Sequence, residues 1–132
     1  MSPKRFRTRP GGLVEARKRR DIAQSYFDAA DLLSSDPGPA INTSIGNAVL
    51  AGIAAGDAIC LAAIGARYAG QDHGAAADFL EAVDPEVGRR LRTLVGFKSA
   101  SHYGDSILTG PDRTAALRHA KALVDEALRR TI

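Results

Sequence analysis

The feature that most constrains the fold is a long apolar run over residues 48–66, which contains a single charge, Asp57. The run is long enough to span a membrane. However, a central aspartate costs roughly 3 kcal/mol on insertion, and the run consists largely of alanine and glycine, which contribute little to insertion. We therefore expect a buried central helix in a cytoplasmic protein, with no membrane partner.

Helix-breaking residues divide the chain into helical segments. Between these breaks, apolar residues recur at helical spacing, and no segment alternates for long enough to predict a strand. Hydrophobic residues make up 45% of the chain, but aromatic residues only 5%, and this composition favours closely packed helices. We predict an all-α fold, a four-helix bundle with an additional short helix. The expected helices cover about residues 14–34, 39–69, 73–83, 85–104 and 112–130.

Particular residues are expected to shape the first two helices. Helical spacing in the first helix predicts an apolar face opposite several charges. Glycines in the second helix predict close crossings with neighbouring helices, because glycine lets backbones approach. The apolar face of the first helix comprises Ile22, Tyr26, Ala29, Ala30 and Leu33. Its charged residues available to solvent are Arg19, Arg20, Asp28 and Asp31. The glycines of the second helix are Gly46, Gly52, Gly56 and Gly65.

The basic residues gather near the start of the chain. Residues 1–20 contain eight basic side chains and one acidic side chain, whereas residues 21–132 contain ten basic and fourteen acidic ones. We expect a flexible basic arm over residues 1–13 and a helical domain over residues 14–132. Such an arm either contacts nucleic acid phosphates, or is a solvated tail that aids solubility, or folds back onto the acidic body. The candidate binding residues at this end are Arg17, Lys18, Arg19 and Arg20.

Lys98 and His102 extend the apolar stripe of the fourth helix, which contains Leu91 and Val95. Polar side chains on such a face need partners. In one interpretation, the lysine extends to the rim of the core and the histidine forms a structural hydrogen bond. In the other, a cation and an imidazole face a phosphate together.

Asp57 is a second candidate, because an isolated carboxylate in an apolar helix is costly to bury. It is expected either to form a structural salt bridge or to lie at the mouth of a cleft. Lys98, His102 and Tyr103 are the expected partners.

Asp72 and His73 follow the apolar helix, and both are candidate binding residues. Asp72 is expected to cap the third helix, and His73 to lie at the surface.

The sequence offers little support for a metal or another cofactor. The three histidines show no paired ligand spacing, so we expect no metal. No glycine-rich phosphate loop occurs, and we expect no cofactor. Cys60 is the single cysteine, which excludes an intrachain disulfide, and it is expected to be a small buried residue.

Three segments together resemble the HEPN superfamily, in particular a small actinobacterial subgroup without an established activity. They are the apolar segment 55–60, the turn 70–73 and the segment 98–104, which precedes a last amphipathic helix. The resemblance covers about residues 15–130. It implies a helical bundle that dimerises.

The resemblance also implies a site. Many HEPN proteins are metal-independent ribonucleases, often toxins of toxin–antitoxin systems, and their signature is an arginine followed after four to six residues by a histidine. Here the matching residues are Lys98 and His102, with Tyr103 next to the histidine. The spacing is one residue short, and lysine lacks the bidentate fork of arginine.

Three functions follow as hypotheses. The first is a dimeric interaction module that binds a partner protein or a nucleotide without catalysis. The second is a metal-independent ribonuclease or RNA-binding toxin-type domain, in which His102 is the general acid or base and Lys98 stabilises the developing charge. The third is a nucleic-acid-binding accessory protein that acts through its basic arm.

Overall fold

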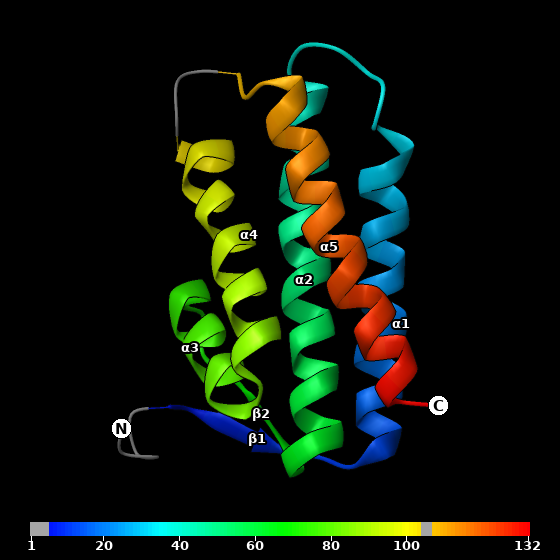
Figure 1. The fold of residues 1–132 in the computed structure, drawn as a ribbon, viewed down its shortest axis with the longest axis vertical. Helices are drawn as coiled ribbons and strands as arrows, with labels where there is room; N and C mark the ends of the chain where they lie inside the picture. Colours follow the sequence, from blue (N-terminus) through cyan, green and yellow to red (C-terminus); the bar gives the residue numbers. More distant parts are fainter. Residues whose placement is uncertain (1–5, 104–106) are drawn as a thin grey trace.

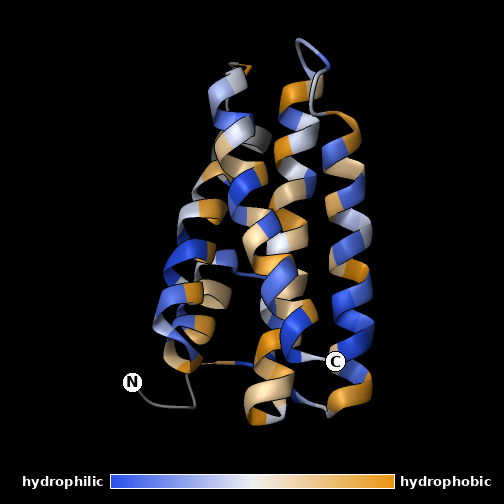
Figure 2. Ribbon diagram, turned by 45° about the vertical axis from the view of Figure 1, so that its right-hand side comes forward, coloured by the Kyte–Doolittle hydropathy of each residue, from blue (hydrophilic) through white to orange (hydrophobic). Residues whose placement is uncertain are grey.

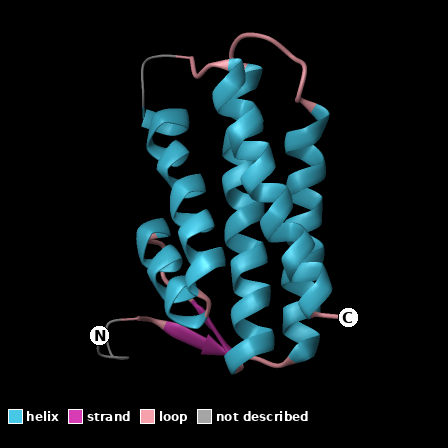
Figure 3. Cartoon of the chain, viewed as in Figure 1, coloured by secondary structure: helices cyan, strands magenta, loops and turns pink. Residues whose placement is uncertain are grey.

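The computed structural model describes residues 6–103 and 107–132, apart from the side chains of residues 99–103. Five helices form an all-α bundle, as predicted, and a two-stranded sheet lies at one end of it (Figures 1 and 3). We call this end the foot of the bundle. In chain order the elements are β1 (Thr8–Pro10), α1 (Leu13–Leu32), α2 (Ala40–Ile64), β2 (Ala66–Tyr68), α3 (His73–Val83), α4 (Pro85–Tyr103) and α5 (Gly110–Arg130).

The apolar helix α2 is the centre of the bundle, as the sequence predicts. It packs against all four other helices, and its residues from Ala54 to Leu61 are all buried. By length and composition it could cross a membrane, but 67% of its most apolar window is buried inside the bundle. Hydrophobic residues are concentrated along α2, whereas α1 carries long hydrophilic stretches (Figure 2). This pattern is typical of a helix in the core of a bundle.

Glycines shape α2 in two different ways. At Gly52, an added Cβ would collide with the side chain of Leu94, so α4 crosses closely there, as predicted. Gly65 instead ends the helix, because it adopts the left-handed conformation (φ 70°) and its N–H donates to the carbonyl of Leu61. The helix is therefore shorter than expected, and the next three residues form β2.

The strand pair corrects the prediction that the whole basic arm is flexible. Thr8–Pro10 pairs antiparallel with Ala66–Tyr68, and the amide of Gly11 donates to the carbonyl of Gly65 (3.0 Å). Phe6 packs edge-on against Phe79 of α3. Residues 6–12 are thus fixed to the bundle, and residues 1–5 lie outside the described residues. A three-residue strand is too short to leave an alternating sequence pattern.

The buried face of α1 agrees with the prediction at Ala30 but differs from it at Ile22 and Tyr26. Ala16, Ala23 and Ala30 are fully buried against the core, whereas Ile22 and Tyr26 are 39% and 37% exposed. Small side chains permit this close packing on α2, where the hydroxyl of Ser44 donates to the carbonyl of Ala30 (2.7 Å). Ile22 and Tyr26 are left at the edge of the contact, whereas Phe27 is half-buried against the core.

The predicted starts of α3 and α4 are confirmed by their side-chain caps, whereas α5 begins at Gly110, before the expected start at residue 112. The carboxylate of Asp72 accepts the amide of Gly74 (2.9 Å), that of Asp84 accepts the amide of Glu86 (3.2 Å), and Thr109 caps α5. The caps at Asp72 and Asp84 fix the turns on either side of α3.

Candidate anion-binding site

Helical geometry divides the basic run 17–20 into two pairs that point in different directions. Arg17 donates from Nε to the carbonyl of Thr131 (3.0 Å), and Arg20 donates to the same carbonyl from Nη1 (3.2 Å). Cations at these carbonyls stabilise the C-terminal end of α5. The structure therefore gives Arg17 and Arg20 a structural role, and Lys18 and Arg19 face elsewhere.

Lys18 and Arg19 line a hollow of about 300 Å³ at the foot of the bundle, which we call the basic hollow. Arg9 of β1 and Arg67 of β2 line it as well, and these two residues are direct cross-strand partners. Four cations from three elements thus converge on one small space. The remaining lining residues are Pro10, Glu15, Ile22 and Leu61.

The cations of the basic hollow are only partly compensated. Among the described residues, no hydrogen bond or ion pair engages the side chains of Arg9 and Lys18, and Arg67 donates to the carbonyl of Tyr68 (3.1 Å). Glu15 is the carboxylate in the lining, and it already accepts the amide of Gly12 (2.7 Å). Like charges directly opposite each other destabilise a strand pair. The arrangement therefore favours an anion in the hollow.

Asp57 lies behind these cations and is paired with Arg19 rather than with α4. Its Oδ2 accepts from Arg19 Nη2 at 3.0 Å, and the residue is only 6% exposed. The expected structural salt bridge is confirmed, but Asp57 forms it with Arg19 of α1 and not with Lys98, and the side chains of the other expected partners, His102 and Tyr103, lie outside the described residues. Arg19 is correspondingly half-buried, not free in solvent as predicted.

Burial dominates the electrostatics of Asp57. It raises the pKa of this carboxyl to about 6, and the attraction of Arg19 and Arg67 only partly opposes the shift. Near neutral pH the carboxylate is charged and neutralises Arg19. The Nε atom of Arg19 is buried and has no hydrogen-bond acceptor among the described residues.

A second hollow, of about 410 Å³, brings together candidates that the sequence separates. Asp72 and His73 line it from the start of α3, and Lys98 lines it from α4. Asp72 is used as the helix cap, and Arg92 in the same lining forms ion pairs with Asp78 (2.7 Å) and Glu81 (2.5 Å). His73 is half-buried. The side chains of His102 and Tyr103 lie outside the described residues, so this hollow is described without them.

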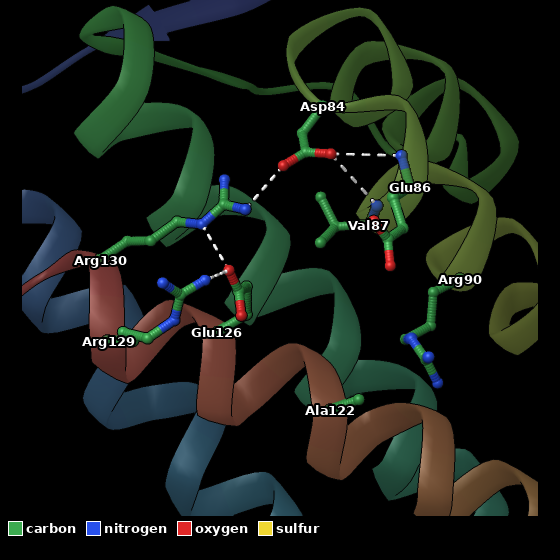
Figure 4. Close-up of a pocket in the computed structure, with 8 residues that line it drawn as sticks. All are labelled: Asp84, Glu86, Val87, Arg90, Ala122, Glu126, Arg129 and Arg130. Carbon is green, nitrogen blue, oxygen red and sulfur yellow. Dashed lines mark hydrogen bonds and ion pairs between the residues drawn. The ribbon is translucent and has the colours of Figure 1, made fainter.

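A third hollow, of about 300 Å³, lies between the start of α4 and the end of α5 (Figure 4). Here Arg130 binds both Asp84 (2.6 Å) and Glu126 (2.9 Å), and Arg129 also binds Glu126. Hydrogen bonding from Arg130 lowers the pKa of Asp84. The lining contains three arginines and three carboxylates, so its charges balance. The ion pairs tie α5 to the turn between α3 and α4.

Charge separates the three hollows. Four cations and one carboxylate line the basic hollow. Two cations and one carboxylate line the second hollow, and three cations and three carboxylates line the third.

The sequence indicated Lys18 and Arg19 as candidate binding residues but not Arg9 and Arg67, since only the pairing of β1 with β2 brings these two together. No family model matches the chain, and neither does any curated protein or solved structure.

Proposed function

We propose that this protein is a non-catalytic module that binds nucleic acid through phosphate contacts at the basic hollow. The observation that carries the proposal is the direct pairing of Arg9 with Arg67 beside Lys18, since this cationic cluster lacks enough carboxylates of its own. Phosphate contacts of this kind supply most non-specific affinity for nucleic acid. The HEPN-like character of the bundle, its dimerisation and its cytoplasmic location stay predictions from the sequence.

The basic surface continues beyond the hollow along the chain. Arg7 is exposed, and its carbonyl accepts the amide of Ala69 (2.7 Å), so the extended pairing reaches this residue. Side chains two residues apart in an extended strand point to the same face. Arg7 and Arg9 therefore form a short cationic track that leads to Lys18 and Arg67 and suits consecutive phosphates of a strand.

The double variant Arg9→Gln with Arg67→Gln is expected to weaken binding of a labelled single-stranded RNA by about tenfold or more. The loss of two phosphate contacts should also make the slope of log affinity against log salt shallower by about 1.4. Fluorescence anisotropy over a salt series measures both quantities. The fold should persist, because the substitutions relieve a cross-strand repulsion.

Arg118→Gln is the matched control for this experiment. Arg118 is exposed on α5 and outside the basic hollow, so its loss should leave most of the affinity unchanged. A loss of log affinity in Arg118→Gln that reaches half of the loss in the double variant, as expected for one charge against two, would indicate a diffuse charge effect and contradict a site at the hollow. Wild-type protein that binds no RNA at low salt would reject the proposed function.

Because the proposed function is non-catalytic, RNA incubated with the protein in EDTA should stay intact on a denaturing gel. The ribonuclease hypothesis predicts the opposite result, metal-free cleavage that is lost in His102→Ala. Such cleavage would assign the function to α4, where the second hollow brings Lys98 close to His73. Cleavage that persists in His102→Ala would point to a contaminating nuclease.

A further inference from the structure

We propose that the basic hollow is a site for a terminal phosphate, a phosphate monoester carrying two negative charges, rather than for a phosphodiester within a strand. This inference rests on the proposed function and names the ligand group that the same site takes. Three features bear on it: the charge balance of the hollow, its buried inner side and the separate position of Arg7.

The charge balance favours a dianion. Arg19 is neutralised by Asp57 through their 3.0 Å ion pair, which leaves Arg9, Lys18 and Arg67 facing the single carboxylate of Glu15. The excess is two positive charges. A phosphate monoester carries close to two negative charges at neutral pH, whereas each backbone phosphodiester carries one. A terminal phosphate therefore compensates the hollow with one group.

The shape of the hollow favours the end of a chain. Leu61 of α2 lines its inner side and is 3% exposed, and the buried Asp57 is joined to Arg19 there. The apolar side chain of Ile22 and the ring of Pro10 also belong to the lining. A phosphate in the hollow therefore has the central helix on its inner side, and a terminal phosphate has to lead only one ester link from there to solvent.

Arg7 lies outside this lining and can be separated from it by experiment. It is exposed and two residues before Arg9, where a strand leaving the hollow would pass. Arg7 should therefore contact the backbone of any strand, whatever its end. Lys18 lies inside the hollow and is exposed, so it should contact the terminal group.

The experiment compares one single-stranded RNA of about ten nucleotides, a typical length for a single-strand site, in three forms: with a 5′-phosphate, with a 3′-phosphate or with hydroxyl ends. At least one phosphorylated form should bind about tenfold more tightly, since it adds charge-assisted hydrogen bonds. Lys18→Gln should abolish this preference. Arg7→Gln should weaken the binding of all three forms by the same factor and preserve the preference for the phosphorylated form.

The competing sources of a terminal phosphate are distinguished in the same assay. A mononucleotide and inorganic phosphate are added as competitors of the phosphorylated RNA. If either displaces the RNA from wild type but not from Lys18→Gln, the hollow recognises the phosphate monoester itself. If neither competitor displaces the phosphorylated RNA, the site takes the end of a strand.

The two proposals fail in different ways. The three RNA forms could bind with equal affinity, and Arg9→Gln with Arg67→Gln could weaken the binding of all of them. This result would overturn the terminal-phosphate inference and keep the proposed function. Direct binding of inorganic phosphate or the mononucleotide without any RNA binding would overturn the proposed function and keep the inference that the hollow takes a phosphate monoester. A phosphate preference that survives Lys18→Gln would place the terminal group outside the basic hollow and overturn the inference.

Discussion

At pH 7, Asp57→Asn is expected to be more stable than the wild type, and its stability should depend less on pH. The folded protein holds a proton on Asp57 up to about pH 6, whereas the unfolded chain releases it near 3.8. Because the native state binds more protons between these values, the free energy of unfolding of the wild type decreases as pH rises through them. The shift corresponds to about 3 kcal/mol. Asparagine does not titrate, so the variant avoids this loss of stability as pH rises.

Urea denaturation of both proteins from pH 4 to pH 7 measures the difference. The two unfolding free energies should be similar at pH 4 and should diverge until about pH 6. Asp31→Asn serves as the control, since Asp31 is exposed on α1 and its change should leave the pH dependence unaltered. A variant that loses stability at pH 7 would show that the attraction of Arg19 outweighs burial.

Gly88→Ala is expected to lower the free energy of unfolding by about 3 kcal/mol. Gly88 is buried in the first turns of α4, and an added Cβ would lie well inside van der Waals contact of the backbone N and Cα of Glu81 in α3. A clash with backbone atoms cannot be relieved by a new rotamer. The two helices would have to separate, and the turn at Asp84 would move with them.

Gly96→Ala is the matched control on the same helix. Gly96 is exposed, and an added Cβ would meet nothing within 4 Å. The higher helix propensity of alanine should stabilise this variant by about 1 kcal/mol. Thermal unfolding of the two variants should therefore shift in opposite directions. A Gly88→Ala protein as stable as the wild type would mean that α3 and α4 do not pack through their backbones.

The helix starts could be predicted because their signals are local. Asp72 and Asp84 each lie directly before the helix that they cap. The end of α2 was harder to predict, because Gly65 resembles the glycines that allow close crossings until its left-handed conformation is seen. The packing of α1 depends on alanines, whose burial leaves a weaker periodic signal than that of larger residues.

The candidate site was only partly visible in the sequence. Lys18 and Arg19 lie in an obvious basic run, but the same run contains Arg17 and Arg20, which bind the end of α5. Arg9 and Arg67 are far apart in the chain and meet through the register of a strand pair that no pattern predicts. The partner of Asp57 depended in the same way on the register between α1 and α2.

The contact of Arg17 and Arg20 with the end of α5 has a consequence for the order of folding. Arg17 and Thr131 are 114 residues apart, and their hydrogen bond can form only after residue 131 has been synthesised. The contacts between α1 and α2, in contrast, join neighbouring helices and can form early. A growing chain can thus complete the α1–α2 hairpin first, but the surface of α1 that receives α5 stays uncovered until the end of α5 has emerged.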